Sequence, residues 1–138
     1  MKDVVIDTNI VISSVISQTG NPSAIMDLVS DKEIQVYYSN EVLDEYKKVL
    51  AYERLKIDPR KQTEIIEKVK EIGIFITPEK SGIPMTHEDD RVFYDTAKAA
   101  NAILITGNIK HYPNEKFIMT PTEYLRERER ENIHQHDR

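Results

Sequence analysis

Acidic side chains stand where this sequence could most easily carry chemistry. Asp7 directly follows the apolar residues 4–6, which have the composition of a buried strand. In a parallel sheet, ligands bind beyond the carboxyl ends of the strands, so an acid at this position faces a crevice. The competing interpretation is that Asp7 caps a helix that begins near Asn9, because Asp is a good N-cap residue. Whether Asp7 is a functional acid or a helix cap depends on which other acids reach the same end of the sheet.

A second acid, Glu45, lies in the strongest helix signal of the chain, residues 40–56. The apolar residues of this segment gather on the face of Tyr46, and Glu45 lies at the edge of that face, about 100° away. Glu41 and Asp44 lie further round and fit a solvated, acidic first turn favoured by the helix dipole. That interpretation fits Glu45 less well, since an acid that borders the core needs a partner or a cation.

The third acidic position is the pair Asp89-Asp90, which opens a helix expected over residues 91–101. Capping and the helix dipole explain one acid, while the other can face the crevice. Asp90 lies about 60° from the inner-face residue Phe93, whereas Asp95 lies about 160° away and is expected to be solvated. A further polar group, Thr106-Gly107-Asn108, follows the apolar residues 102–105.

Alternating strands and helices are needed to position these groups. We expect strands over residues 4–6, 34–38, 74–76, 102–106 and 117–119, and helices over residues 9–17, 23–29, 40–56, 61–71, 91–101 and 123–131. This alternation predicts an α/β fold, a three-layer α/β/α sandwich with a central, mostly parallel, roughly five-stranded sheet. Parallel connections bring the strand ends to one side, so Asp7, Glu45 and Asp90 can converge on one crevice.

The chemistry of such a crevice follows from its charges. Three carboxylates repel one another, and protonating one is costly at neutral pH. A divalent cation resolves the conflict, and an all-oxygen ligand set favours Mg²⁺ or Mn²⁺ over Zn²⁺. Carboxylate-bound Mg²⁺ activates water and stabilises the attacking and leaving oxygens of a phosphodiester. The pattern therefore predicts a metal-dependent hydrolase that acts on phosphodiester bonds.

Other chemistries fit the sequence less well. There are four glycines and no phosphate-binding or dinucleotide fingerprint. A serine hydrolase elbow is missing, and Asn9 stands where an aspartyl phosphatase needs its second acid. The absence of cysteine excludes a disulfide framework and thiolate metal sites. The histidines lack the helical spacing of a metal-binding pair; they are residues 87, 111, 134 and 136.

Length and composition are those of one domain of common size, with 138 residues and a net charge of −5. The acidic balance argues against a generally basic nucleic-acid-binding surface but allows a local basic groove. No apolar run approaches the roughly 20 residues of a membrane span, and residues 1–3 are too short for a signal peptide, so we expect a soluble, cytoplasmic protein. Arg and Glu alternate from Arg126 onward, which leaves little apolar face on the last helix. Residues 1–122 are therefore expected to form the domain, and residues 123–138 an exposed, charged C-terminal helix and tail. Residues 132–138 of this tail are expected to be poorly ordered.

Taken together, these motifs resemble those of PIN-domain proteins over residues 4 to about 121. The resemblance rests on four groups, Asp7-Thr8-Asn9, Ser39 with Glu41 and Glu45-Tyr46, Asp89-Asp90 with Phe93 and Ala97, and Thr106-Gly107-Asn108. It is strongest with the toxin components of bacterial and archaeal toxin–antitoxin pairs. The resemblance implies the α/β/α fold, an endoribonuclease dependent on Mg²⁺ or Mn²⁺, an RNA substrate, a homodimer and an antitoxin partner.

The resemblance also assigns roles by position. Asp7, Glu45 and Asp90 match the first three family acids and are the expected catalytic and metal-binding residues. Asn9 and Thr106 are expected to orient them. Asn108 stands where a fourth acid often follows Thr-Gly; an Asn can ligate through its carbonyl or hold a water, so one or two metal ions remain open.

Positive side chains near these motifs are candidates for contacts with RNA phosphates, with a solvated face as the alternative for each. They are Lys47, Lys48, Arg54 and Lys110. Two further functions also stay open at this point. One is a catalytically inactive PIN-fold binding or regulatory module, for which Asn108 is the sign of decay. The other is an RNA-processing nuclease without an antitoxin.

Overall fold

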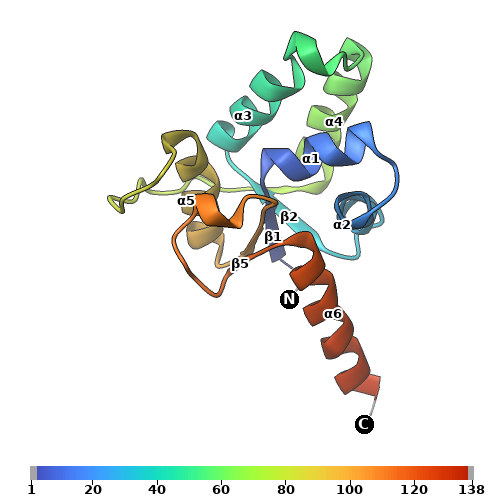
Figure 1. Ribbon diagram of the computed structural model, residues 1–138, viewed down its shortest axis with the longest axis vertical. Helices are drawn as coiled ribbons and strands as arrows, with labels where there is room; N and C mark the ends of the chain where they lie inside the picture. Colours follow the sequence, from blue (N-terminus) through green and yellow to red (C-terminus); the bar gives the residue numbers. More distant parts are fainter. Residues whose placement is uncertain (1–2, 137–138) are drawn as a thin grey trace.

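A central sheet of five parallel strands organises the computed structural model, which describes residues 3–136, with side chains for residues 3–133 (Figure 1). The strands are β1 (Asp3–Ile6), β2 (Gln35–Tyr38), β3 (Ile74–Phe75), β4 (Ile103–Ile105) and β5 (Ile118–Met119). Their order is β3-β2-β1-β4-β5, and Val4 of the middle strand pairs with Val36 and Ile103 on its two sides. The predicted parallel sheet is confirmed.

Six α-helices surround the sheet within the described residues. They are α1 (Thr8–Ile16), α2 (Asn21–Ser30), α3 (Asn40–Leu50), α4 (Pro59–Ile72), α5 (Arg91–Ala100) and α6 (Pro121–His136). Helix α5 covers one face of the sheet, α1 and α2 lie on the opposite side, and α6 extends away from the body (Figure 1). This arrangement confirms the three-layer α/β/α fold. No described helix combines the length and the apolar character needed to cross a membrane.

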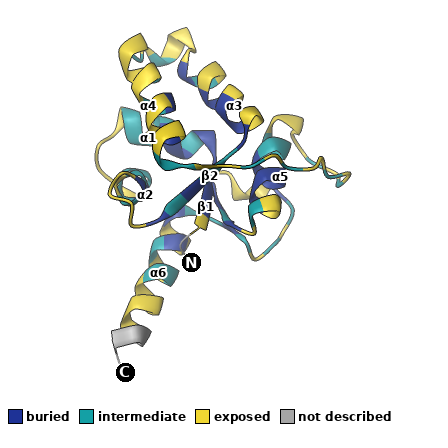
Figure 2. Cartoon of the chain, turned by 180° about the vertical axis from the view of Figure 1, so that it is seen from behind, coloured by how far each residue is buried: buried dark blue, intermediate teal, exposed yellow. Residues whose placement is uncertain are grey.

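The core lies in the middle strands, because helices cover them on both sides. Val4, Val5 and Leu104 are completely buried, and Figure 2 shows this buried centre flanked by helices with exposed outer faces. Continuous apolar runs are typical of strands with two covered faces, which is why residues 4–6 and 102–105 predict the sheet so directly.

Helix α3 is shorter than the sequence predicts. Ser39 caps it by accepting a hydrogen bond from the backbone N–H of Val42 at 3.2 Å. The predicted helix over residues 40–56 was wrong at its end, since α3 stops at Leu50 and a short 3₁₀ helix (Glu53–Leu55) follows. The reason is packing, because no side chain of residues 51–56 is fully buried, so no buried stripe continues the helix beyond Leu50.

Two expectations for polar segments are also corrected. Asp95, expected to be solvated, is only 5% exposed, and its Oδ2 accepts a hydrogen bond from the backbone N–H of Ser81 at 3.2 Å. The loop that carries Ser81 passes over α5 and buries Asp95. A helical projection of residues 91–101 cannot reveal a contact with a distant loop. Helix α6 continues to His136, beyond the predicted residue 131, and buries Tyr124 in the core. Of the expected disordered tail, residues 132–136 are helical and residues 137–138 lie outside the described residues.

Candidate active site

A cleft of about 320 Å³ opens at the carboxyl end of the sheet, where β1 meets α1, α3 and the start of α5. The three predicted acids Asp7, Glu45 and Asp90 all line this cleft. Asn9 and Asn108 line it as well. Residues that are far apart in the chain therefore share one opening, at the end of the sheet where parallel α/β proteins bind their ligands.

Asp7 is the most deeply placed of these acids, with 4% of its surface exposed. Its Oδ2 accepts hydrogen bonds from the hydroxyls of Thr106 at 2.8 Å and Tyr112 at 2.7 Å. Asp7 occupies the N-cap position of α1, yet its side chain makes no capping hydrogen bond. The backbone N–H groups of Thr8 and Asn9 lower its pKa only after the side-chain hydroxyls do, so Thr106 and Tyr112 are its main partners. Tyr46 stabilises the same turn, because its hydroxyl donates to the carbonyl oxygen of Ile6.

Thr106 connects Asp7 with the polar end of β4. Its hydroxyl gives its single proton to Asp7 and accepts from the backbone N–H of Asn108 at 3.0 Å and from the side-chain amide of Asn9 at 3.4 Å. The Oδ1 atom of Asn9 in turn accepts from the backbone N–H of Gly107 at 2.9 Å. These contacts fix the Asp7 carboxylate, which is the role expected of residues that orient a ligand.

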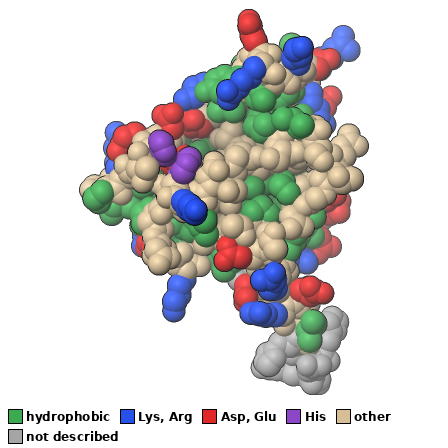
Figure 3. Space-filling model, viewed as in Figure 1, with side chains coloured by type: hydrophobic (Ala, Val, Ile, Leu, Met, Phe, Trp, Pro, Cys, Tyr) green, Lys and Arg blue, Asp and Glu red, His purple; other side chains and the backbone are tan. Residues whose placement is uncertain are grey.

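Asp90 reaches the cleft at the end of a second 3₁₀ helix (Glu88–Asp90). Its Oδ2 atom is buried, accepts no well-aligned hydrogen bond and lies 3.3 Å from Nδ1 of His111. The rings of His111 and His87 lie 4.4 Å apart, centre to centre. Figure 3 shows two histidines beside acidic side chains on this face.

Burial raises the pKa of both acids. The pKa of Asp7 is raised by burial, although hydrogen bonds from Tyr112 and Thr106 lower it in part. The pKa of Asp90 is raised by burial and then by the charge of Asp7, while His111 and His87 lower it. Burial and the charge of Asp7 also raise the pKa of the Tyr112 hydroxyl, which therefore keeps its proton and donates. Burial therefore disfavours the charged form of both carboxylates, and the charge of Asp7 disfavours it further at Asp90.

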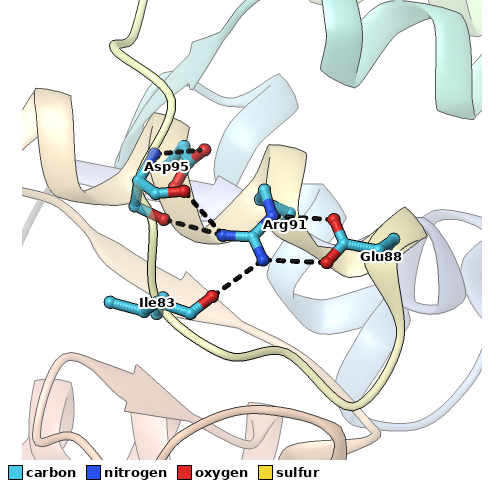
Figure 4. A network of polar contacts seen from close by, with 5 residues as sticks. Ile83, Glu88, Arg91 and Asp95 are labelled. Carbon is cyan, nitrogen blue, oxygen red and sulfur yellow. Dashed lines mark hydrogen bonds and ion pairs between the residues drawn. The ribbon is translucent and has the colours of Figure 1, made fainter.

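Arg91 holds the segment that carries Asp90 in place (Figure 4). Its guanidinium forms two hydrogen bonds of 2.8 Å with the carboxylate of Glu88. It also donates to the carbonyl oxygens of Ser81 at 2.8 Å and Ile83 at 2.7 Å. One side chain therefore connects the loop that crosses α5 with the 3₁₀ helix in which Asp90 lies.

Glu45 is engaged differently from the other two acids. Its carboxylate lies 2.9 Å from the Nζ atom of Lys48, which is also 3.7 Å from Asp89. The hydrogen bond with Glu45 raises the pKa of Lys48. Within the described part of the chain, no three His, Asp or Glu side chains form a group that could hold a metal ion. Glu45 therefore faces a lysine, whereas Asp90 lies close enough to Asp7 for the charge of Asp7 to raise its pKa.

The four basic residues predicted from the sequence have different surroundings. Lys48 is occupied by acids, and Arg54 lines the cleft with its guanidinium over the ring of Tyr52, 5.2 Å from the centre. Lys47 is exposed on α3. Lys110 lines a separate groove beside α6.

Sequence reasoning missed Tyr112, His87 and His111. Tyr112 is 7% exposed, and its hydroxyl reaches Asp7 across 105 positions of sequence. The sequence signal that could have indicated Tyr112 and His111 is their place in the chain, a few residues after the polar motif at residues 106–108.

Comparison with known proteins identifies the family. The model of the PIN domain family matches residues 3–110. The uncharacterized protein MJ1680 of Methanocaldococcus jannaschii is 31% identical over 112 residues, which cover 76% of this chain and 70% of that protein. A chain in the crystal structure of VapBC2 from Rickettsia felis, bound to a DNA fragment from their promoter, shares the fold, with a TM-score of 0.55, 18% identity and coverage of 86% of this chain and 96% of that chain. The family match spans most of the sequence and includes every acid of the cleft, so the protein belongs to the PIN domain family.

Proposed function

We propose that this protein is an endoribonuclease dependent on Mg²⁺ or Mn²⁺ and the toxin of a toxin–antitoxin pair. PIN domains are nucleases that generally use divalent metal ions, so the family supports hydrolysis of phosphodiester bonds. The proposal goes beyond the family in two respects: the substrate is RNA, and the metal ion is Mg²⁺ or Mn²⁺.

The observation that supports this function best is that the carboxylates of Asp7 and Asp90 line one cleft. Burial raises the pKa of each, and the charge of Asp7 raises that of Asp90 further. The buried Oδ2 of Asp90 accepts no well-aligned hydrogen bond and has only Nδ1 of His111 nearby, at 3.3 Å, which leaves it able to ligate a cation. Mg²⁺ is commonly held by one or two carboxylates and keeps several waters, so this pair fits it. Glu45 and Asn108 are the further oxygen donors at the rim, and Glu45 would have to leave Lys48 to reach a metal ion.

When bound, the metal ion supplies an activated water and stabilises the attacking and leaving oxygens. The protein's own contribution is orientation and charge. Thr106 and Tyr112 hold one oxygen of Asp7 and so fix the orientation of its carboxylate in the cleft. Arg54 lines the cleft with a positive charge that attracts a phosphate, whereas Lys48 is paired with Glu45 and Asp89.

Cleavage of single-stranded RNA in Mg²⁺ or Mn²⁺ tests this function directly. We expect Asp7→Asn and Asp90→Asn to lose more than about 100-fold in activity, because even residues that only orient metal ligands cost 10–100-fold. Asp44→Asn, an exposed acid on α3, is the charge-matched control and should cleave as the wild type does. Equal cleavage by wild type and Asp7→Asn would refute the metal role.

Metal binding provides a second readout that needs no substrate. At a Mn²⁺ concentration of 100 times its Kd, the folded state should gain about 2.7 kcal/mol. Asp7→Asn should lose this gain, whereas Asp44→Asn should keep it. Stabilisation no larger than that given by NaCl at equal ionic strength would favour the inactive binding module.

The toxin assignment is supported by the structural likeness to VapBC2, a complex described with DNA from its own promoter. We propose a homodimer with an antitoxin partner encoded by a neighbouring short gene. Expression should arrest growth, co-expression of the neighbouring gene should relieve the arrest, and light scattering should give the mass of a dimer. Growth without arrest, together with RNA cleavage, would favour a processing nuclease.

A further inference from the structure

A second groove, of about 1020 Å³, lies between the turn at residues 109–116 and α6. Tyr112, which donates to Asp7, forms part of its wall, and Asn108 lines the neighbouring cleft. Residues 108–112 therefore separate the groove from the candidate active site. We propose that this groove binds the phosphodiester backbone of single-stranded RNA that enters the cleft.

The groove offers positive charges that no acid occupies. Lys110, Lys116 and Arg126 line it and are exposed. None of the three forms an ion pair with another side chain of residues 3–133. They come from two separate elements, the turn and α6, and so face the groove from both sides. Figure 3 shows basic side chains among acidic ones where α6 leaves the body.

The acids of the groove are, by contrast, already engaged. Glu115 accepts from the hydroxyl of Tyr94 and lies 3.6 Å from Lys98. Glu123 accepts from the backbone N–H of Thr120 at 3.0 Å. Glu127 lies 2.7 Å from Arg130. The backbone hydrogen bond leaves the charge of Glu123 in place, so three unpaired cations face one unpaired acid among the described residues of the groove. The balance is positive, although the whole chain carries a net charge of −5.

A polyanion is the ligand that fits this arrangement, because phosphate contacts made by Lys and Arg carry most of the affinity for nucleic-acid backbones. Lys110 stands two residues from Asn108, so a strand lying in the cleft passes directly from one site to the other. The identity of the polyanion as RNA rests on the proposed function. The positive charge of the groove is observed independently of the proposed function.

Binding of a fluorescently labelled single-stranded RNA in EDTA tests the groove without turnover. Each phosphate contact contributes about −0.7 to the slope of log K against log salt, so three contacts give about −2. The variant Lys110→Gln/Lys116→Gln/Arg126→Gln should lose that part of the slope. At 0.1 M salt its affinity should fall about 100-fold, the value that this slope gives.

The matched control removes three positive charges at the other end of the molecule, on α4 (Figure 1). The variant Arg60→Gln/Lys68→Gln/Lys70→Gln changes the net charge equally and should bind RNA within about threefold of the wild type, since long-range charge effects are screened. Equal losses in the two triple variants, or none in the groove variant, would overturn the proposal. So would poly-glutamate binding as tightly as RNA, because the groove would then select any polyanion.

The two proposals fail separately. If the wild type cleaves no RNA but binds it, and the groove variant loses binding, the nuclease function fails and the groove remains. If the wild type cleaves RNA and the groove variant binds it unchanged, the groove fails alone. Circular dichroism and the Tm of both triple variants verify that they remain folded.

Discussion

Replacing Tyr112 by Phe removes one hydroxyl from the centre of the candidate site. That hydroxyl donates to Oδ2 of Asp7 at 2.7 Å, and Tyr112 is too buried for water to take its place. A hydrogen bond to a charged group contributes about 1.5–3 kcal/mol. We therefore expect Tyr112→Phe to lower the free energy of unfolding at pH 7 by about 2 kcal/mol, and the Tm by about 6–8 °C for a chain of this length.

The loss should depend on pH in a defined direction. The pKa of Asp7 is raised by burial, so between the unfolded pKa and the folded pKa the folded state binds more protons than the unfolded state. Stability consequently falls as the pH rises through that window. Without the Tyr112 hydroxyl the pKa of Asp7 rises further, and the window extends upward. The cost of Tyr112→Phe should therefore shrink as the pH falls below the ordinary pKa of Asp, about 3.9, where Asp7 is mostly protonated in both variants because its pKa is raised.

Urea unfolding of four proteins measures the effect: wild type, Tyr112→Phe, Asp7→Asn and the double variant. With Asn at position 7, the hydroxyl donates to a neutral group and should contribute only about 1 kcal/mol, giving a coupling of about 1 kcal/mol. Tyr94→Phe is the control, because its hydroxyl donates to Glu115 away from the cleft. An equal cost of Tyr112→Phe in both backgrounds would refute the idea that the hydroxyl stabilises the charge of Asp7.

Three further predictions concern stability. Asp7→Asn should raise the Tm of the metal-free protein at pH 7 by removing a buried charge, a gain of about 0.5–2 kcal/mol that disappears near pH 4 in thermal melts. Ser39→Ala should cost about 1–2 kcal/mol in urea unfolding, since it removes the buried cap of α3. Gly73→Ala should cost about 1–3 kcal/mol, because its Cβ would lie 2.6 Å from a backbone oxygen and 2.8 Å from the ring of Tyr38. Gly82→Ala, whose Cβ meets nothing within 4 Å, should be neutral, and equal costs for the two alanines would contradict the packing argument.

Much of the fold could be predicted because its signals are local. The apolar residues before Asp7 and those before Thr106 are continuous runs, which indicate strands covered on both faces. The sequence pattern also predicted the start of α5 at Arg91. The end of α3 was missed, because a helix stops where its buried stripe ends, and burial depends on neighbours distant in the chain.

In the candidate site, too, local sequence patterns predicted some residues, while contacts between distant segments determined the others. That Asp7 and Asp90 stand at a strand end and a helix start follows from patterns a few residues long. Asp95 was misjudged because the loop that covers it comes from residues 76–87. Tyr112 was missed because nothing in its own neighbourhood indicates a carboxylate partner.

The sequence by itself determined the order of the elements, the acids at their ends and the family of the chain, since hydrophobic periodicity and motif spacing are encoded over short stretches. Only the tertiary structure decided that Asp7 bonds to Tyr112, that the loop at residues 76–87 covers Asp95, and that the groove beside α6 adjoins the cleft. These are properties of side chains brought together by the sheet and its helices. Their energies depend on burial and distance, which no local pattern specifies.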